Sequence, residues 1–255
     1  MSRFHTHALT LHGHGRPYDL APHVKVVAAF GFMIGVVATP REAFWAFGAY
    51  ALVVIGVAVS ARIPPLFMAS RMVVEIPFIL FALFLPFVGV GPRVPVGPLE
   101  LSIEGIWGAW SILARATLGT ATAVLLIATT PVTDVLAGMS RLRVPAALVA
   151  IAGFMIRYLE VVFDEAGRMR TAMVARGWHP KARRSLRAAG SMAGALLVRA
   201  YERGERVHQA MVARGYDGVM PTLFPPSARA GDWLVGASPA VIAIGVAVLT
   251  RTVGS

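Results

Sequence analysis

The chain contains no cysteine and only two lysines among its 255 residues. The absence of cysteine excludes both a disulfide framework and a thiolate metal site. The two lysines, Lys25 and Lys181, lie outside any Gly-x-x-x-x-Gly-Lys-Ser/Thr sequence, so the chain has no phosphate-binding P-loop. If the protein takes part in an ATP-driven process, another chain must therefore hydrolyse the ATP.

Charged residues are also scarce. They make up 15% of the chain, whereas hydrophobic residues make up 56%. Soluble domains usually contain about 25% charged and about 45–50% apolar residues. The composition therefore predicts an all-α polytopic membrane protein, embedded in a lipid bilayer. Residues 1–23 lack the apolar core and cleavage site of a signal peptide, so we expect a polar N-terminal arm before a retained first helix.

Signatures of catalysis are missing as well. The chain has no His-Glu-x-x-His and no Gly-x-Ser-x-Gly sequence, and in Gly-Ser-Met-Ala-Gly at 190–194 the serine comes one position too early. Without a nucleophile–base pair or a metal triad, we do not expect an enzyme or a cofactor. We expect no nucleic-acid partner either, because the basic part of the chain has no aromatic stacking ladder and no known nucleic-acid motif.

Five hydrophobic stretches predict transmembrane helices, since a helix needs roughly 20 mostly apolar residues to cross the bilayer core. The first two follow each other closely and are expected to form a tight helical hairpin. The fourth is rich in Ala, Thr and Gly, which favours close helix packing in lipid. The stretches are 24–38, 43–60, 66–90, 106–130 and 233–249. The first four form a predicted transmembrane part, residues 24–143, and the last one lies in residues 232–255.

Positive charge predicts the orientation. Residues 157–231 hold 13 of the 24 Lys and Arg residues but only 6 of the 13 Asp and Glu residues. Basic segments of polytopic proteins remain in the cytoplasm. We therefore predict that the hydrophobic residues 144–163 enter the edge of the bundle or lie along its cytoplasmic surface, within a cytoplasmic helical module, 144–231. This topology has five crossings, with the N-terminus in the cytoplasm and the C-terminus outside. A sixth crossing is the alternative.

One short sequence, Ala-Met-Val-Ala-Arg-Gly, occurs twice, at 172–177 and at 210–215. An aromatic residue, Trp178 or Tyr216, follows each copy. Glycine just past a helix end supplies the left-handed residue that closes the helix, and arginine in the last turn faces the negative end of the helix dipole. Each copy is thus expected to end a helix. This explains the Arg-Gly pair but not the rest of the repeat.

The repeat extends beyond its six letters, because a shift of 38 residues also pairs Arg168 with Arg206. On a helix, positions 168, 172 and 176 lie on one face, so each copy presents small and apolar side chains that end in one arginine. Such a surface suits docking into a groove of a partner protein. Two similar helices then suggest a dimeric partner or two homologous partners.

These features resemble a known family. Paired Ala-Arg-Gly signatures in two cytoplasmic helices, each followed by an aromatic residue, are similar to those of the T component of energy-coupling factor (ECF) transporters, and most similar to its cobalt-type member, the CbiQ family. The most typical stretch is 205–218, Glu-Arg-Val-His-Gln-Ala-Met-Val-Ala-Arg-Gly-Tyr-Asp-Gly. Residues 19–26, Asp-Leu-Ala-Pro-His-Val-Lys-Val, are similar to the family's Asp-Pro-Arg-x-Lys-Leu entry into the first helix, with His23 in place of the arginine.

The resemblance implies a scaffold in a bacterial cytoplasmic (inner) membrane. T components join two cytoplasmic ABC-type ATPases to a membrane substrate-binding subunit, and each arginine-bearing helix inserts into a groove on one ATPase. Cobalt is the first substrate implied for the complex, with nickel, biotin or another vitamin as alternatives. The residues implied at the ATPase are Ala175, Arg176, Gly177, Ala213, Arg214 and Gly215, supported by Arg168, Met173, Arg206 and Met211. We assign no catalytic residue and no metal ligand.

A self-sufficient membrane carrier is the alternative from a different class. A carrier needs polar residues around a site near the middle of the membrane, and these are sparse. Glu75, four residues after Arg71, is either half of an ion pair near the interface, which we favour, or a functional intramembrane residue. Arg115 has no partner nearby in the sequence, and either bonds carbonyls inside the bundle or contacts another subunit.

Histidines are concentrated in the N-terminal arm. Their imidazole nitrogens are suitable ligands for Co, Ni or Zn. They are equally explained as incidental residues of a polar arm, and the resemblance implies that the metal binds to the substrate-binding subunit instead. The residues concerned are His5, His7, His12, His14 and His23.

Overall fold

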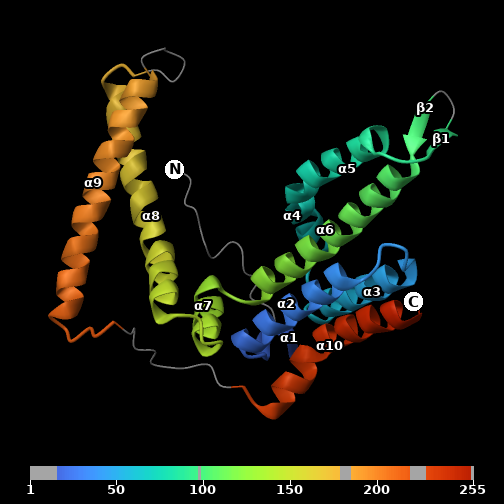
Figure 1. Cartoon of the computed structure of the whole chain (residues 1–255). Helices are drawn as coiled ribbons and strands as arrows, with labels where there is room; N and C mark the ends of the chain where they lie inside the picture. The colour runs from blue at the N-terminus through green and yellow to red at the C-terminus, as the bar shows by residue number, and fades with distance from the viewer. Residues whose placement is uncertain (1–15, 97–98, 179–184, 219–227, 254–255) are drawn as a thin grey trace. The chain divides into compact units, whose positions relative to one another are not determined.

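The computed structural model describes residues 16–96, 99–178, 185–218 and 228–253, and these are almost entirely helical (Figure 1). In chain order the elements are α1 (Arg16–Asp19), α2 (Pro22–Ala38), α3 (Phe44–Ser60), α4 (Pro65–Arg71), the 3₁₀ helix η2 (Met72–Glu75), α5 (Ile76–Val88), β1 (Arg93–Val96), β2 (Leu99–Ser102), α6 (Ile103–Thr129), α7 (Val132–Arg141), α8 (Ala146–Ala175), α9 (Ser185–Val212) and α10 (Ala230–Val253). The expected all-α class is confirmed. The small antiparallel hairpin β1–β2 and the short helices α1 and α7 were not predicted from the sequence.

The chain forms two compact units. We call His5–Met139 together with Pro225–Ser255 the transmembrane unit. The second unit comprises Ser140–Phe224 together with Met1–Phe4. We call it the α8–α9 unit after its two long helices. Each unit is described by itself.

Long apolar helices make this a multi-pass membrane protein. Four helical segments within the described residues are long and apolar enough to span a bilayer: Pro65–Val88, Ile103–Thr129, Ala146–Ala175 and Ala230–Thr252. The apolar helices α2 and α3 are shorter, at 17 residues each. Residues 146–163 of the predicted hydrophobic stretch 144–163 and the polar residues that follow them are joined in one continuous helix, α8. Because α8 is long enough to cross, the count of five crossings stays a prediction.

Prolines set many of the helix boundaries. Proline is tolerated in the first helical turn, where its missing N–H has no partner to lose, and Pro22 and Pro65 open α2 and α4. Pro77 likewise lies in the first turn of a helix, α5, but inside the third hydrophobic stretch. It cannot donate to the carbonyl of Val73, which instead accepts from the N–H of Ile76 in a 3₁₀ turn. The stretch is therefore divided into α4, η2 and α5.

Helix α2 makes its most extensive contact with α10, and the expected tight hairpin of α2 with α3 was wrong. The contact depends on small residues. A Cβ atom added to Gly31 would lie 2.8 Å from Cβ of Ala240, and one added to Gly35 would lie 2.7 Å from the Ala243 backbone. In lipid, helices associate through such close packing because burial of apolar surface provides no driving force.

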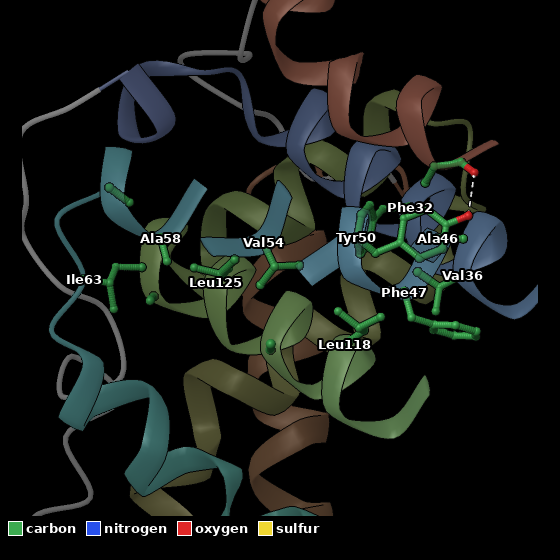
Figure 2. Close-up of a cluster of buried hydrophobic side chains, with 14 residues drawn as sticks. Phe32, Val36, Ala46, Phe47, Tyr50, Val54, Ala58, Ile63, Leu118 and Leu125 are labelled. Atoms are coloured by element: carbon green, nitrogen blue, oxygen red, sulfur yellow. Dashed lines mark hydrogen bonds between the residues drawn. The ribbon is translucent and has the colours of Figure 1, made fainter. Parts of the chain in front are cut away.

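The core of the transmembrane unit lies among α2, α3, α6 and α10 (Figure 2). Phe32 and Tyr50 meet edge to face, with ring centroids 5.7 Å apart, and Tyr50 is fully buried. The Tyr50 hydroxyl donates to the carbonyl of Ala243 at 3.1 Å and also bonds Thr39 Oγ1 at 2.7 Å. Its polar group is thus satisfied within the apolar core, as burial requires.

Arg115 bonds a carbonyl within the bundle, which was one of its two expected roles. Its Nη2 donates to the carbonyl of Thr39 at 2.9 Å, and Arg251 Nε donates to the carbonyl of Ala38 at 3.1 Å. The last carbonyls of a helix have no partner within that helix. Arginines from α6 and α10 therefore cap the end of α2.

The expected Arg71–Glu75 ion pair was wrong. Glu75 is buried, with 4% of its surface exposed, and accepts a hydrogen bond from the hydroxyl of Thr117 in α6. The guanidinium of Arg71 lies over the ring of Phe67, 4.9 Å from its centroid. The two residues do not face each other because the 3₁₀ turn η2, which contains Glu75, interrupts the α-helical spacing that would align them.

Candidate functional site

The first copy of the repeat ends helix α8 with a well-defined C-terminal cap. The α-helix stops at Ala175, and Gly177 adopts a left-handed backbone with φ of 80°. The N–H of Gly177 donates to the carbonyl of Val174 at 3.0 Å, and the N–H of Trp178 donates to the carbonyl of Met173 at 3.1 Å. These two bonds form a Schellman motif, which satisfies carbonyls that the ended helix leaves free.

The second copy repeats this geometry bond for bond. Gly215 has φ of 87°. Its N–H donates to the carbonyl of Val212 at 2.9 Å, and the N–H of Tyr216 donates to the carbonyl of Met211 at 3.0 Å. The helix ends expected at the two copies are confirmed, and the repeat in sequence is a repeat in structure.

The Schellman motif explains only part of what the two copies share. It requires the glycine, because a side chain disfavours a positive φ. It uses only the backbone of the arginine and of the aromatic residue. The guanidinium groups of Arg176 and Arg214 make no hydrogen bond or ion pair with any residue that the structure describes. All six residues expected at the partner are exposed: Ala175, Arg176, Gly177, Ala213, Arg214 and Gly215.

The two arginines lie at opposite ends of an antiparallel pair of helices (Figure 1). Near the middle of the pair, Glu165 of α8 binds Arg199 of α9. Near one end, Met211 of α9 lines the same cavity as Phe154, which is close to the start of α8. Helix α9 has 28 residues, and at about 1.5 Å per residue it is about 42 Å long. The α8–α9 unit thus presents two equivalent arginines that are far apart.

Glu165 forms an ion pair between the two helices and lies beyond the apolar residues 146–163 of α8. It accepts from Arg168 on its own helix at 2.6 Å as well as from Arg199. Hydrogen bonds from these two guanidinium groups lower the pKa of Glu165 below its ordinary value, so the carboxylate is charged at neutral pH.

The four supporting residues have contacts within the chain. Arg168 pairs with Glu165, and Arg206 lies 4.0 Å from a carboxylate oxygen of Glu202. Met173 and Met211 are half-buried, and Met211 lines a cavity of about 370 Å³ between α8 and α9. Arg168, Arg206 and Met211 thus lie against other residues of the α8–α9 unit, whereas the guanidinium groups of Arg176 and Arg214 bind no described residue.

Two features of the unit were not singled out from the sequence. The indole Nε1 of Trp178, just after the first helix end, is buried without a hydrogen-bond partner among the described residues. The cavity between the helices was also unforeseen, since it depends on how α8 and α9 pack. The only sequence signal for the buried indole of Trp178 was the aromatic residue that follows each copy of the repeat.

Metal ligation gains no support from the described residues, where no group of three or more His, Asp or Glu side chains comes together. His5, His7, His12 and His14 lie outside those residues. His23 is buried at the start of α2, with its ring 5.8 Å from that of Trp233.

Comparison with known proteins identifies the family of the chain. The family CbiQ, described as cobalt transport protein, matches residues 17–223. The cobalt transport protein CbiQ of Rhodobacter capsulatus is 33% identical over 163 residues, which cover 64% of this chain and 65% of that protein. A putative fused cobalt transport protein CbiMQ of Methanocorpusculum labreanum is 27% identical over 128 residues, 50% of this chain and 21% of that protein. The chain thus matches less than two thirds of the length of either. The energy-coupling factor transporter transmembrane protein EcfT of Thermosediminibacter oceani is 24% identical over 212 residues, 79% of this chain and 80% of that protein.

Proposed function

The chain belongs to the CbiQ family, the T components of ECF transporters, and we propose that it is the subunit that transmits motion from two ABC-type ATPases to a substrate-binding membrane subunit. The observation that carries this proposal is the pair of matching helix ends. Each has an exposed arginine that no described residue binds, and each is closed by the same hydrogen bonds.

An unpaired, exposed arginine at a rigid helix end is well suited to bind another protein. A guanidinium group presents donors in a fixed fork that fits a carboxylate or the free carbonyls at a helix end. Arg176 and Arg214 are flanked by Ala175, Gly177, Ala213 and Gly215, whose small side chains leave room for a groove to close around each end. Two equivalent ends at opposite ends of α8–α9 match two equivalent ATPase subunits.

The proposed topology has α8 and α9 on the cytoplasmic side of a bacterial cytoplasmic (inner) membrane, with the N-terminus on the same side. The basic character of residues 157–231 supports it. In this topology the apolar half of α8 enters the edge of the bundle or lies along its cytoplasmic surface. The proposed parts are an arm, 1–23, a transmembrane part, 24–143, a coupling module, 144–231, and a last transmembrane helix within 232–255.

We propose cobalt as the substrate of the whole complex, because two of the relatives are named as cobalt transport proteins. Nickel, biotin or another vitamin is the alternative. The substrate-binding subunit, not this chain, would select among them. Uptake by this chain alone in liposomes would contradict the proposal and indicate a self-sufficient carrier.

Co-purification with the ATPase subunits of the same transporter tests the proposal. The wild type is compared in detergent with the double variant Arg176→Ala/Arg214→Ala. A matched control is Arg170→Ala/Arg187→Ala, which removes one exposed arginine from α8 and one from α9, neither of which the two copies share. We expect the wild type and the control to retain the ATPase and the test variant to lose at least 90% of it. Equal retention by all three proteins would contradict docking at the helix ends.

A further inference from the structure

A cavity of about 390 Å³ lies inside the transmembrane unit, among α2, α3, α6 and α10. Its size is within the range of pockets that bind small ligands. It is partly open, and it is lined by the beginnings of α2 and α10, by the ends of α3 and α6, and by Pro17 of α1. Helices α2 and α10 run parallel, since Gly31 and Gly35 meet Ala240 and Ala243 in the same order. Lys25 near the start of α2 bonds Thr129 at the end of α6, so these helix ends are on one side of the unit. The cavity therefore lies within one leaflet of the bilayer.

The tertiary contacts explain why this space is open. Helix α2 packs mainly on α10, and Phe32, which meets Tyr50 of α3, also lines the cavity. Pro239 lies within α10 and lines the cavity. It cannot donate to the carbonyl of Val235, which instead accepts from the hydroxyl of Ser238 at 2.8 Å.

The hydroxyl groups around the cavity are already engaged in the same way. Thr129 Oγ1 donates to the carbonyl of Leu125 at 2.8 Å, and Ser60 Oγ donates to the carbonyl of Val57 at 2.8 Å. With these donors used, the remaining lining is mostly aliphatic. The interior therefore fits a hydrocarbon chain and offers little to water or to a polar solute.

One charged side chain, Lys25, lines the cavity. Its ammonium group donates to the carbonyls of Tyr18 at 3.0 Å and Thr129 at 3.1 Å. An ammonium group has three N–H donors, so one is left, and the part of the chain that the structure describes offers Lys25 no direct ion pair. Two carboxylates, Asp134 and Asp19, are near enough to act on it electrostatically.

We propose that this cavity binds one phosphatidylethanolamine molecule, with an acyl chain among α2, α3, α6 and α10 and its phosphate at Lys25. A basic group between transmembrane helices at the level of the headgroups is a recurrent lipid site. Asp19 and Asp134 complement the positive ethanolamine group, and they repel a lipid with a net negative charge. The site would give the bundle a lipid where its helices separate.

Native mass spectrometry of the full chain tests the site. The protein is stripped of lipid in detergent and then titrated with phosphatidylethanolamine or phosphatidylglycerol. The wild type should bind one phosphatidylethanolamine molecule at least about tenfold more tightly than phosphatidylglycerol. Equal binding of the two lipids, or no saturable binding of phosphatidylethanolamine, would overturn the proposal.

Two glycines of α3 provide a matched pair of variants. Gly56 lines the cavity, whereas Gly48 lies outside it, and neither has an atom within 4 Å of a Cβ built on it. Gly56→Leu places a side chain in the cavity and should reduce phosphatidylethanolamine binding at least about tenfold. Gly48→Leu should bind as the wild type does. Equal affinity of the two variants would show that the lipid does not occupy this cavity.

Variants of Lys25 test the headgroup. Lys25→Gln keeps two N–H donors for the carbonyls but removes the charge, and it should weaken phosphatidylethanolamine binding severalfold. Lys25→Arg keeps the charge and should restore most of the affinity. If glutamine binds as well as lysine, the phosphate is not at this position.

Discussion

Glycines inside helices meet different surroundings in the two units of this chain. In the transmembrane unit, a Cβ on Gly31 or Gly35 would collide with α10. In the α8–α9 unit, four glycines within the helices have open space where a Cβ would be: Gly167, Gly190, Gly194 and Gly204. Glycine within a helix costs about 1 kcal/mol relative to alanine. Packing within the chain offsets that cost at Gly31 and Gly35, whereas no atom within 4 Å offsets it at these four glycines of the α8–α9 unit.

The difference indicates what each unit is built to contact. The transmembrane unit uses its small residues to bring its own helices together. The α8–α9 unit keeps glycines and exposed apolar side chains such as Leu197 and Tyr201 on its surface, at 72% and 70% exposed. This is the pattern expected of a surface that another protein covers, in agreement with the proposed ATPase docking.

The largest expected effect is on transport. Replacing both Arg176 and Arg214 by alanine should reduce ATP-driven uptake by the reconstituted complex at least about 100-fold. Each arginine contributes only about 0.3–1 kcal/mol to its helix end through the dipole, so the fold should remain. Uptake is measured in proteoliposomes, and thermal unfolding of the purified chain serves as the control. Loss of uptake together with loss of the fold would contradict a docking role.

The next largest effect is expected from a substitution that disturbs the contact between α2 and α10. Gly35→Ala places a methyl group against the Ala243 backbone and should destabilise the transmembrane unit by about 1–3 kcal/mol through overpacking. Gly48→Ala is the matched control in an open position, and it should be neutral or stabilise by up to about 1 kcal/mol. Denaturation in detergent measures both. If Gly35→Ala is as stable as its control, the close α2–α10 packing is wrong.

A left-handed backbone distinguishes Gly215 from glycines that are merely helical. Gly215→Val forces a β-branched residue to a φ of 87°, which costs about 1–3 kcal/mol at such positions. Gly204→Val, within α9 and in open space, should cost less because its backbone is helical. Limited proteolysis after the end of α9 should increase in the first variant alone. Equal cleavage of the two variants would show that the Schellman motif does not hold this end.

Gly190 and Gly194 of α9 are four residues apart, on one face of the helix, and both lie in open space. Gly190→Ala/Gly194→Ala should stabilise α9 by up to about 2 kcal/mol in the isolated chain, from about 1 kcal/mol per glycine. If a partner approaches this face closely, the same variant should weaken retention of the complex severalfold. Circular dichroism and co-purification measure the two effects separately. A variant that gains stability and retains the complex fully would mean that the partner does not use this face.

The smallest expected effect concerns the ion pairs of Glu165. Its pKa is lowered in the folded protein, so its contribution is fully present above its ordinary value of 4.5 and is lost as the pH falls below that value. Glu165→Gln should slightly lower the thermal stability of α8–α9 at pH 7 and abolish this acid dependence. Thermal unfolding followed between pH 7 and acidic pH measures it. An unchanged acid dependence in the variant would assign it to another carboxylate.

Features that depend on neighbouring residues could be predicted from the sequence. Proline at the first position of α2 and the Arg-Gly pairs at 176–177 and 214–215 specify helix boundaries, since each acts on its own turn of backbone. The hydrophobic stretches identified α2, α3, α6 and α10 to within a few residues for the same reason. The two helix ends of the candidate site were recognisable because the whole signal of each is contained in six to seven residues.

Contacts between distant parts of the chain could not be predicted in this way. Every helix of a membrane bundle is apolar, so hydrophobicity does not identify the neighbour of a helix. Gly31 and Gly35 indicate that another helix packs closely on α2, but they do not show that this helix is α10. The sequence by itself determined an all-α membrane protein with two equal helix ends. Only the tertiary structure decided that Arg115 caps α2, that Thr117 rather than Arg71 binds Glu75, and that Arg176 and Arg214 lie at opposite ends of one helix pair. Backbone capping is local, whereas these contacts join residues that only packing brings together.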